Sequence, residues 1–312
     1  MSHPPRRSSI LELEYGCCRA VLHKACALGD MPLVRELALQ GAKTTDGQGR
    51  TAMHRAAAAG QLEAVLWLAS TGEYSMSART MQGRTPLHAA VLGGHLPVVR
   101  ALLELPGVDA RALASDGSDA VLLAAKAGRF DVLHWLVGDA GLRADTRDDG
   151  GACALHWAVI RDGGTGGGVA CARYLLACGQ GAAAWQDSEG NNVAHYAALC
   201  GRLGLLQWLV DTQHIDLRAQ NYDGLDCAAW AGLRGQMAVS DWISVYFAAQ
   251  DCAQTQKLLS PATKEDEPST HTSFADLGGL GRTFAALGSS VARFVNSSSP
   301  PPQQQRRMSQ MV

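Results

Sequence analysis

Histidine recurs at one fixed place in this sequence, and histidine is the side chain most often used for proton transfer near neutral pH. In "GRTPLHAAVLGG", which begins at Gly83, a threonine, a proline and a leucine precede His88. A catalytic histidine normally occurs once, beside a nucleophile or a carboxylate. Five histidines in equivalent positions therefore indicate a shared structural role: His23, His54, His88, His156 and His195.

Two other residue patterns could do chemistry, and neither is complete. The nine cysteines include no C-x-x-C pair, which favours reduced thiols in a cytosolic protein over disulfides or a metal site. The glycine-rich segment "DGGTGGG" (162–168) lacks the lysine that a phosphate-binding loop needs. We interpret it as an insertion between two helices. The sequence thus predicts no cofactor, no metal and no catalytic residue, so we expect a protein that is not an enzyme.

The net charge and the hydropathy of the chain limit its classes of partner and its location in the cell. The formal net charge is -2, so no global field attracts nucleic acid. No apolar run approaches the roughly 20 residues that span a bilayer, and the first residues lack the apolar core of a secretory signal. We expect a cytoplasmic protein, with the nucleus as the alternative.

The chain repeats itself along most of its length. Aligned on the residue that opens each copy, the last six copies are spaced by 34, 34, 34, 39 and 34 residues. A fixed period of this size predicts a solenoid of stacked units. The seven copies start near Cys18, Gly49, Gly83, Gly117, Gly151, Gly190 and Gly224.

Each copy predicts two short helices and a loop. In the third copy Thr85 is placed to cap a helix whose first residue is Pro86, where a missing N–H costs nothing. That helix ends at Gly94, and an apolar face at helical spacing follows. The residues of this second face are Val98, Val99, Leu102 and Leu103.

These residues resemble the ankyrin repeat, whose Thr-Pro-Leu-His signature is complete at 85–88. The resemblance covers about residues 18–249 and implies an all-α solenoid of stacked helix pairs with short hairpin loops. It also implies that the histidine fastens the turn and hydrogen-bonds toward the next copy. The fourth copy departs from the signature, since Asp119 and Leu122 replace the threonine and the histidine. Asp119 is still able to cap a helix.

The family resemblance also implies a function, the binding of another protein on a concave face lined by hairpin tips and first-helix ends. We expect a monomer with one protein partner, contacted by a tip row that is basic at its start and acidic later. The tip residues are Arg50, Arg84, Asp116, Asp149, Glu189 and Asp223. The first-helix residues are Leu92, Lys126, Ile160, Arg161, Leu199, Leu233 and Arg234.

The ends of the chain differ from the repeats. We predict a disordered tail over 1–17, a linker over 250–270, an amphipathic segment over 271–296 and a disordered low-complexity tail over 297–312. Ser9 and Ser309 follow arginine pairs and are candidate phosphorylation sites. The amphipathic stripe consists of Leu277, Leu280, Phe284, Leu287, Val291 and Phe294.

Two alternatives to a simple adaptor stay open. The amphipathic segment could lie on a membrane surface and make the protein a peripheral membrane adaptor. Its apolar stripe could instead cover the last repeat, because terminal repeats need a polar outer face. The other functional alternative is the non-catalytic part of an enzyme complex.

Overall fold

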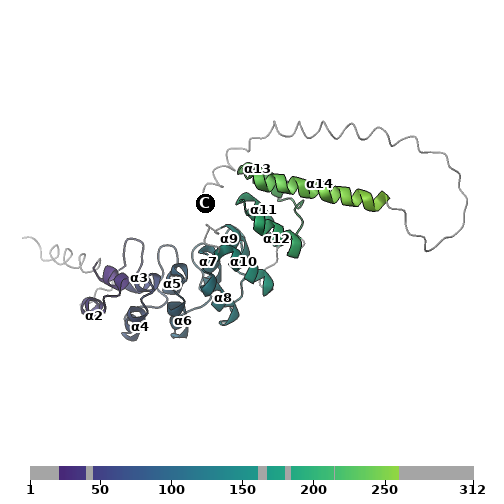
Figure 1. Ribbon diagram of the computed structural model, residues 1–312. Helices are drawn as coiled ribbons and strands as arrows, with labels where there is room; N and C mark the ends of the chain where they lie inside the picture. Colours follow the sequence, from purple (N-terminus) through teal and green to yellow (C-terminus); the bar gives the residue numbers. More distant parts are fainter. Residues whose placement is uncertain (1–20, 40–44, 161–166, 180–183, 214, 260–312) are drawn as a thin grey trace, which may run out of the picture. The chain divides into compact units, whose positions relative to one another are not determined.

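The computed structural model describes most of the repeat region and the helix that follows it (Figure 1). The chain separates into two units, Met1–Gln256 and Lys257–Val312, and the helix pairs belong to the first. The described residues are 21–39, 45–160, 167–179, 184–213 and 215–259.

Several predictions fall outside these residues. They concern the tails, the amphipathic segment and three single side chains: 1–17, 271–296, 297–312, Ser9, Arg161 and Ser309.

The described residues form pairs of short α-helices, and their β structure is limited to one isolated bridge, between Arg147 and Cys153. Residues 21–28 are helical and open the series. The first helices of the later copies are α3 (Ala52–Ala58), α5 (Pro86–Gly93), α7 (Ala120–Lys126), α9 (Ala154–Ile160), α11 (Val193–Leu199) and α13 (Cys227–Leu233). The second helices are α2 (Met31–Leu39), α4 (Leu62–Ser70), α6 (Leu96–Glu104), α8 (Phe130–Gly138), α10 (Gly167–Ala177), α12 (Leu203–Gln213) and α14 (Met237–Leu259).

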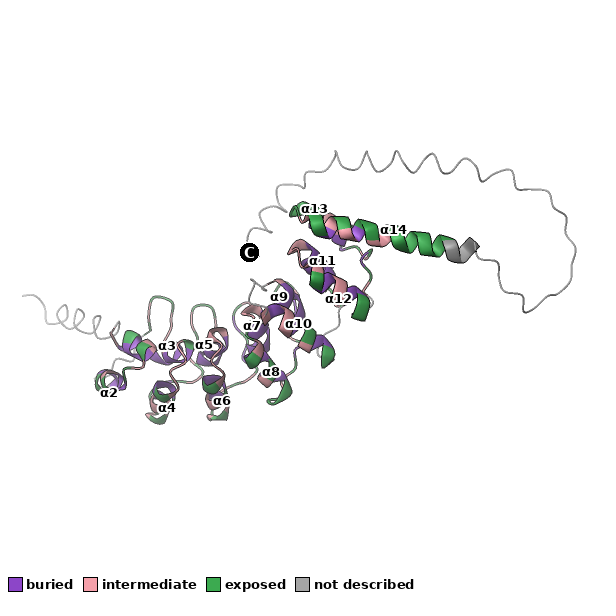
Figure 2. Cartoon of the chain, in the orientation of Figure 1, coloured by how far each residue is buried: buried purple, intermediate pink, exposed green. Residues whose placement is uncertain are grey.

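The helices stack in two layers. Each first helix from α3 to α13 contacts the next first helix, and each second helix from α2 to α10 contacts the next second helix. The buried residues lie between these layers (Figure 2). This is the all-α solenoid of stacked helix pairs that the repeat predicts.

Polar caps begin the first helices. Thr85 accepts a hydrogen bond from the backbone N–H of His88, and Pro86 opens the helix as predicted. Gly94 ends α5 at φ +81°, a conformation that L side chains rarely adopt. Asp119 caps α7 through the N–H of Leu122, so the predicted substitute cap of the fourth copy is confirmed.

A second set of contacts joins the N-terminal ends of the second helices to the preceding copy. The side chain just before each helix donates to the carbonyl oxygen of a first-helix residue in that copy. These contacts hold successive copies in register. The pairs are Gln61 with Ala27, His95 with Ala58, and Arg129 with Leu92.

Tryptophans occupy one position of several second helices. Trp135 and Trp208 are half-buried against the core. Arg100 of the preceding copy lies over the Trp135 ring, and Arg173 lies over Trp208, each 5.2 Å from the ring centroid. These tryptophans therefore pack between copies.

The last helix corrects one predicted boundary. Helix α14 runs to Leu259, whereas the sequence predicts a linker from residue 250. The segment "AQDCAQTQKLL" contains good helix formers and no glycine or proline, so nothing ends the helix before Pro261. None of the described helices combines the length and the hydrophobicity that crossing a membrane requires.

Candidate functional site: the hairpin ridge

Six hairpins stand in a row beside the first helices. Their tips are joined by backbone hydrogen bonds, in which one tip donates an N–H to a carbonyl of the preceding tip. We call this continuous row the hairpin ridge; it consists of residues 46–50, 80–84, 114–118, 148–152, 187–191 and 221–225. The joining bonds are Met81 to Gln48 (3.0 Å), Ser115 to Gln82 (2.9 Å), Asp149 to Asp116 (3.1 Å), Ser188 to Gly150 (3.1 Å) and Tyr222 to Glu189 (3.0 Å).

Glycine is required where adjacent hairpins approach each other. Gly151 has φ +73°, and a Cβ added there would lie 2.7 Å from the backbone nitrogen of Ser188. Any larger residue would therefore push two hairpins apart. The glycine that opens each copy in the sequence thus allows the ridge to form.

The repeated histidines lie just beneath the ridge. The Nδ1 atom of His88 accepts from the N–H of Thr85 (3.1 Å), and its Nε2 lies 3.0 Å from the carbonyl oxygen of Ala112, just before the hairpin that leads into the next copy. Nδ1 accepts a hydrogen bond, so Nε2 carries the proton and donates it. The same link toward the next hairpin is made by His54 to Arg84, His156 to Trp185 and His195 to Leu225.

Both ring nitrogens are therefore used by the fold. Burial disfavours the imidazolium form and lowers the pKa of His54, His88 and His195 below 6.5. A neutral, buried ring with two backbone partners has no free nitrogen for proton transfer. The predicted structural role of these histidines is confirmed.

The fifth copy carries the arrangement that most resembles a catalytic pair. Cys153 replaces the capping threonine, and its Sγ lies 3.2 Å from Nδ1 of His156. Both residues are fully buried, and the two ring nitrogens contact the Cys153 N–H and the Trp185 carbonyl. A substrate cannot reach this thiol, so the pair belongs to the fold.

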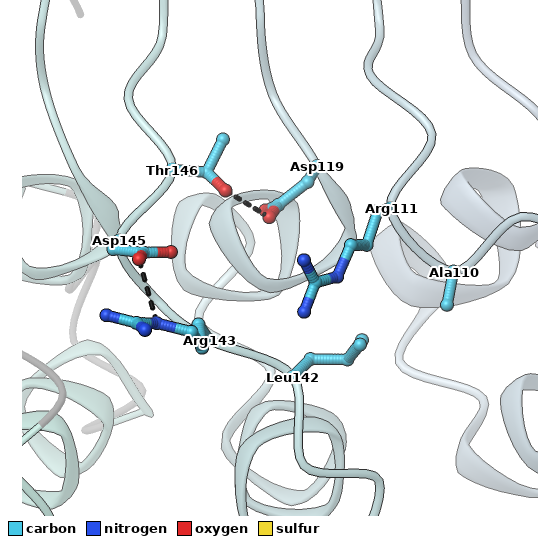
Figure 3. Close-up of a pocket in the computed structure, with 7 residues that line it drawn as sticks. All are labelled: Ala110, Arg111, Asp119, Leu142, Arg143, Asp145 and Thr146. Carbon is cyan, nitrogen blue, oxygen red and sulfur yellow. Dashed lines mark hydrogen bonds and ion pairs between the residues drawn. The ribbon is translucent and has the colours of Figure 1, made fainter.

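The fourth copy replaces the histidine link by another contact. The hydroxyl of Thr146, just before the next hairpin, donates to the Asp119 carboxylate at 2.6 Å. A cavity of about 60 Å³ lies beside this bond, and Arg143 at its edge pairs with Asp145 (Figure 3). Pockets for small-molecule ligands are several times larger. The residues that line the cavity are Ala110, Arg111, Asp119, Leu142, Arg143, Asp145 and Thr146.

Lys126 is a half-buried member of the predicted partner-binding residues. Its Nζ contacts the carboxylates of Asp116 (3.0 Å) and Asp148 (3.2 Å), which belong to successive hairpins. Nζ also lies 4.5 Å from the centroid of the Trp157 ring. Its side chain is only 15 % exposed. Lys126 therefore joins two adjacent hairpins from a largely enclosed position.

Of the two arginines at the predicted basic start of the ridge, Arg50 has its charge paired within the chain. Arg50 is half-buried, and its Nε bonds the Asp46 carboxylate at 2.8 Å. Asp46 also accepts from Arg55 at 3.1 Å. Arg84 is half-buried, and its carbonyl is the acceptor for His54.

The other predicted residues differ in exposure. Asp149, Asp223 and Arg234 are exposed, whereas Asp116 and Glu189 are half-buried. The described residues of the first-helix row are mostly half-buried, and only Leu233 and Arg234 at its end are exposed. Its half-buried members are Leu92, Lys126, Ile160 and Leu199.

One functional position is not among the sequence predictions. In some hairpins the opening residue binds a side chain of its own first helix, as where Trp157 donates to Asp148 and Tyr196 donates to Asp187. An acidic or amide residue three positions before the opening glycine of a copy is the sequence signal for it. In the last copy, Trp230 has a buried Nε1 with no hydrogen-bond partner among the described residues, and Asn221 stands where the other two copies have aspartate.

The comparisons with known proteins agree with this architecture. A family model described as ankyrin repeats, three copies, matches residues 22–114 and 121–221. A solved structure that is similar to this chain is the ankyrin repeat domain of Bcl-3, a member of the IκB protein family. Its identity is 24 % and its TM-score 0.54, over 70 % of this chain and 96 % of that chain. A search of curated proteins finds no significant match.

Proposed function

Because this chain belongs to the ankyrin-repeat family, whose repeats are in general modules for protein–protein interaction, we propose that it is a non-enzymatic adaptor. Its partner is a protein, which binds along the hairpin ridge and the adjacent ends of the first helices. The proposed contact residues are those predicted from the sequence. Lys126 contributes indirectly, because it joins two hairpins of the ridge.

The main observation in support of this proposal is that the ridge forms one continuous surface. Hydrogen bonds between tips align six hairpins as one surface, and successive copies differ in the side chains presented there. A surface of this kind offers a partner many small contacts and no deep pocket. The histidines are engaged by the backbone, which supports binding over catalysis.

The test is site-directed photo-crosslinking in a cell extract. A photoreactive residue replaces Gln48, Gln82 or Tyr222, which are exposed on the ridge. The matched controls are exposed residues of the second helices: Glu104, Asp131 and Asp211. We expect the same protein to be captured from the ridge positions and not from the controls. Equal capture from both sets would disprove a ridge-binding adaptor.

A charge reversal at Arg84 also tests whether the partner binds along the ridge. Arg84→Glu reverses a half-buried charge at the basic end of the ridge, and we expect it to slow association with the captured protein at low salt. Arg50 is a poorer choice, because reversing it would also break its bond to Asp46. An unchanged association rate would show that the basic end of the ridge does not contact the partner.

A further inference from the structure

The third, fourth and fifth hairpins have an outer face, which is turned away from the first helices. In each of them, and in the residues just before it, exposed and covered side chains alternate. The covered set contacts the first helices, as where Trp157 donates to Asp148. Neighbouring side chains of extended backbone point to opposite faces, so the exposed set points away from these helices. We call this surface the outer face; its arginines and apolar residues are Arg79, Met81, Arg111, Leu113 and Arg147.

Two arginines of the outer face are held in place by neutral groups. Nη1 of Arg79 donates to the carbonyl oxygens of Gly83 (3.1 Å) and Leu113 (2.6 Å). Carbonyl groups fix a guanidinium and leave its positive charge uncompensated. Among the described residues, neither arginine pairs with a carboxylate. Arg147 makes the equivalent bonds, to Gly151 (2.8 Å) and Gln186 (2.7 Å).

The third arginine lies at a cavity in the copy between these two. Figure 3 shows the guanidinium of Arg111 directed into the cavity of about 60 Å³. The two carboxylates that line this cavity are engaged, Asp119 by the hydroxyl of Thr146 and Asp145 by Arg143. The Arg111 side chain has no such partner within the described part of the chain. The cavity has room for about four water molecules, and therefore for one carboxylate group in their place.

Apolar side chains stand between the arginines. Leu113 occupies in the fourth hairpin the place that Arg79 and Arg147 occupy in the third and fifth. It is 48 % exposed, and Met81 at the neighbouring tip is 79 % exposed. The order along the outer face is therefore arginine, leucine, arginine.

The aspartates near the outer face are fewer than its cations. Asp109 accepts the backbone N–H of Arg111 at 2.9 Å, and Asp145 pairs with Arg143 at 2.8 Å. Asp149 is exposed at the tip of the fifth hairpin. Four arginines thus face three aspartates: Arg79, Arg111, Arg143 and Arg147 against Asp109, Asp145 and Asp149.

Two other arginines of the ridge region lie elsewhere. Arg84 is opposite Thr80 in the third hairpin, since the N–H of Thr80 donates to the carbonyl of Arg84. Opposed residues of a hairpin share a face, so Arg84 lies with the covered set. Arg234 follows α13, in the seventh copy. Neither of them adds to the charge of the outer face.

We propose that the outer face binds a linear protein segment in which acidic residues flank an apolar one. The apolar residue covers Leu113 and Met81, and carboxylates meet the guanidinium groups of Arg79, Arg111 and Arg147. None of these five residues is a contact residue of the proposed adaptor, so the inference goes beyond that function and does not depend on it.

The spacing of the copies limits the segment further. Packed helices lie about 8–10 Å apart, so equivalent places two copies apart are about 16–20 Å apart. An extended chain advances about 3.3 Å per residue. Acidic residues that reach both Arg79 and Arg147 should therefore be about five or six residues apart, with the apolar residue between them.

The test selects peptides that need these arginines. A displayed library of random linear peptides is selected on the full-length chain and counter-selected against Arg79→Gln/Arg111→Gln/Arg147→Gln. The recovered peptides are measured by fluorescence anisotropy against the wild type, Arg111→Gln and Leu113→Ser. The matched control is Arg84→Gln, which makes the same charge change on the covered face. Thermal unfolding checks every variant, and Arg111→Gln alone serves for the counter-selection if the triple variant does not fold.

We expect the recovered peptides to carry aspartate or glutamate on both sides of an apolar residue, and added salt to weaken their binding. Arg111→Gln should weaken binding about fivefold or more, and Leu113→Ser about threefold. Arg84→Gln should change it less than twofold. Recovery of no peptide, recovery of basic or uncharged peptides, or equal effects of Arg84→Gln and Arg111→Gln would overturn the inference.

Nucleic acid is the other polyanion that arginines attract. Single strands bind by stacking their bases on aromatic rings, and the five residues of the outer face include none. A fluorescent oligothymidine measured beside the peptides should therefore bind more weakly than they do. Tighter binding of the oligothymidine, lost in Arg111→Gln, would overturn the assignment of a protein segment.

Discussion

At the scale of single residues, the histidine of the copies that carry it makes two hydrogen bonds that a capping hydroxyl cannot make. In the third copy, Thr85 satisfies the N–H of His88, and the His88 ring satisfies the N–H of Thr85. The other ring nitrogen binds the carbonyl of Ala112, just before the next hairpin. One imidazole therefore joins a helix cap to the interface between copies.

His88→Ala should lower the free energy of unfolding by about 2–4 kcal/mol, because it leaves the Thr85 N–H and the Ala112 carbonyl buried without partners. Urea unfolding followed by circular dichroism measures this loss. The control is Met81→Ala, since Met81 is 79 % exposed and should change stability by less than about 0.5 kcal/mol. Equal effects of the two substitutions would refute the role given to His88.

Cys153 is a weaker cap than the threonine of other copies. Its Sγ contacts His156 at 3.2 Å, and a thiol sulfur is a weaker hydrogen-bond acceptor than the hydroxyl oxygen with which Thr85 accepts the N–H of His88. Cys153→Thr should therefore raise the free energy of unfolding by about 0.5–1 kcal/mol. Thr85→Cys is the reciprocal change and should lower it. Urea unfolding of the pair checks both signs, and a shift in the same direction for both would contradict the argument.

At the scale of elements, the ridge depends on contacts between hairpins more than on any single hairpin. Lys126 joins two of them through Asp116 and Asp148. Although burial opposes ionisation, the hydrogen bond and charge of Lys126 hold the pKa of Asp116 below 3.8. The Asp148 side chain is only 8 % exposed, so its charge needs this partner.

Lys126→Met keeps most of the side-chain volume and removes the charge. We expect a loss of about 1–3 kcal/mol in unfolding free energy, because the Asp148 carboxylate stays buried with one cation fewer. Lys24→Met, at an exposed helical position, should have little effect. Chemical denaturation of both variants measures the difference, and equal stabilities would show that Lys126 does not tie the hairpins.

At the scale of the whole repeat region, the histidine links occur near its start, middle and end. The pKa values of His54, His88 and His195 are lowered by burial, so the unfolded chain binds more protons than the folded one below pH 6.5. The stability from these groups is complete above pH 6.5 and is lost as the pH falls below it. This acid sensitivity acts on several interfaces at once.

The melting temperature should therefore fall between pH 7 and pH 5, well above the range in which carboxylates titrate. Differential scanning fluorimetry across this range measures the fall. His88→Gln, an uncharged replacement, should make the dependence shallower. A melting temperature that stays constant from pH 7 to pH 5 would contradict the burial of neutral histidines.

The repeat, the helix pairs, the caps at Thr85 and Asp119, and the structural role of the histidines follow from the sequence alone. These features are local or recur in most copies, so each copy supports the interpretation of the others. The predicted start of the linker at residue 250 was wrong because it lies beyond the last copy, where the pattern ends.

Which side chains of the ridge are exposed follows from the packing of the helices and not from the sequence pattern. Arg50 and Lys126 look like surface charges in the sequence, yet Asp46 and the pair Asp116 and Asp148 bind them. Such pairs join residues of different elements and different copies, so their formation depends on how the helices pack. Charge is a property of the sequence, whereas its exposure is a property of the packed solenoid.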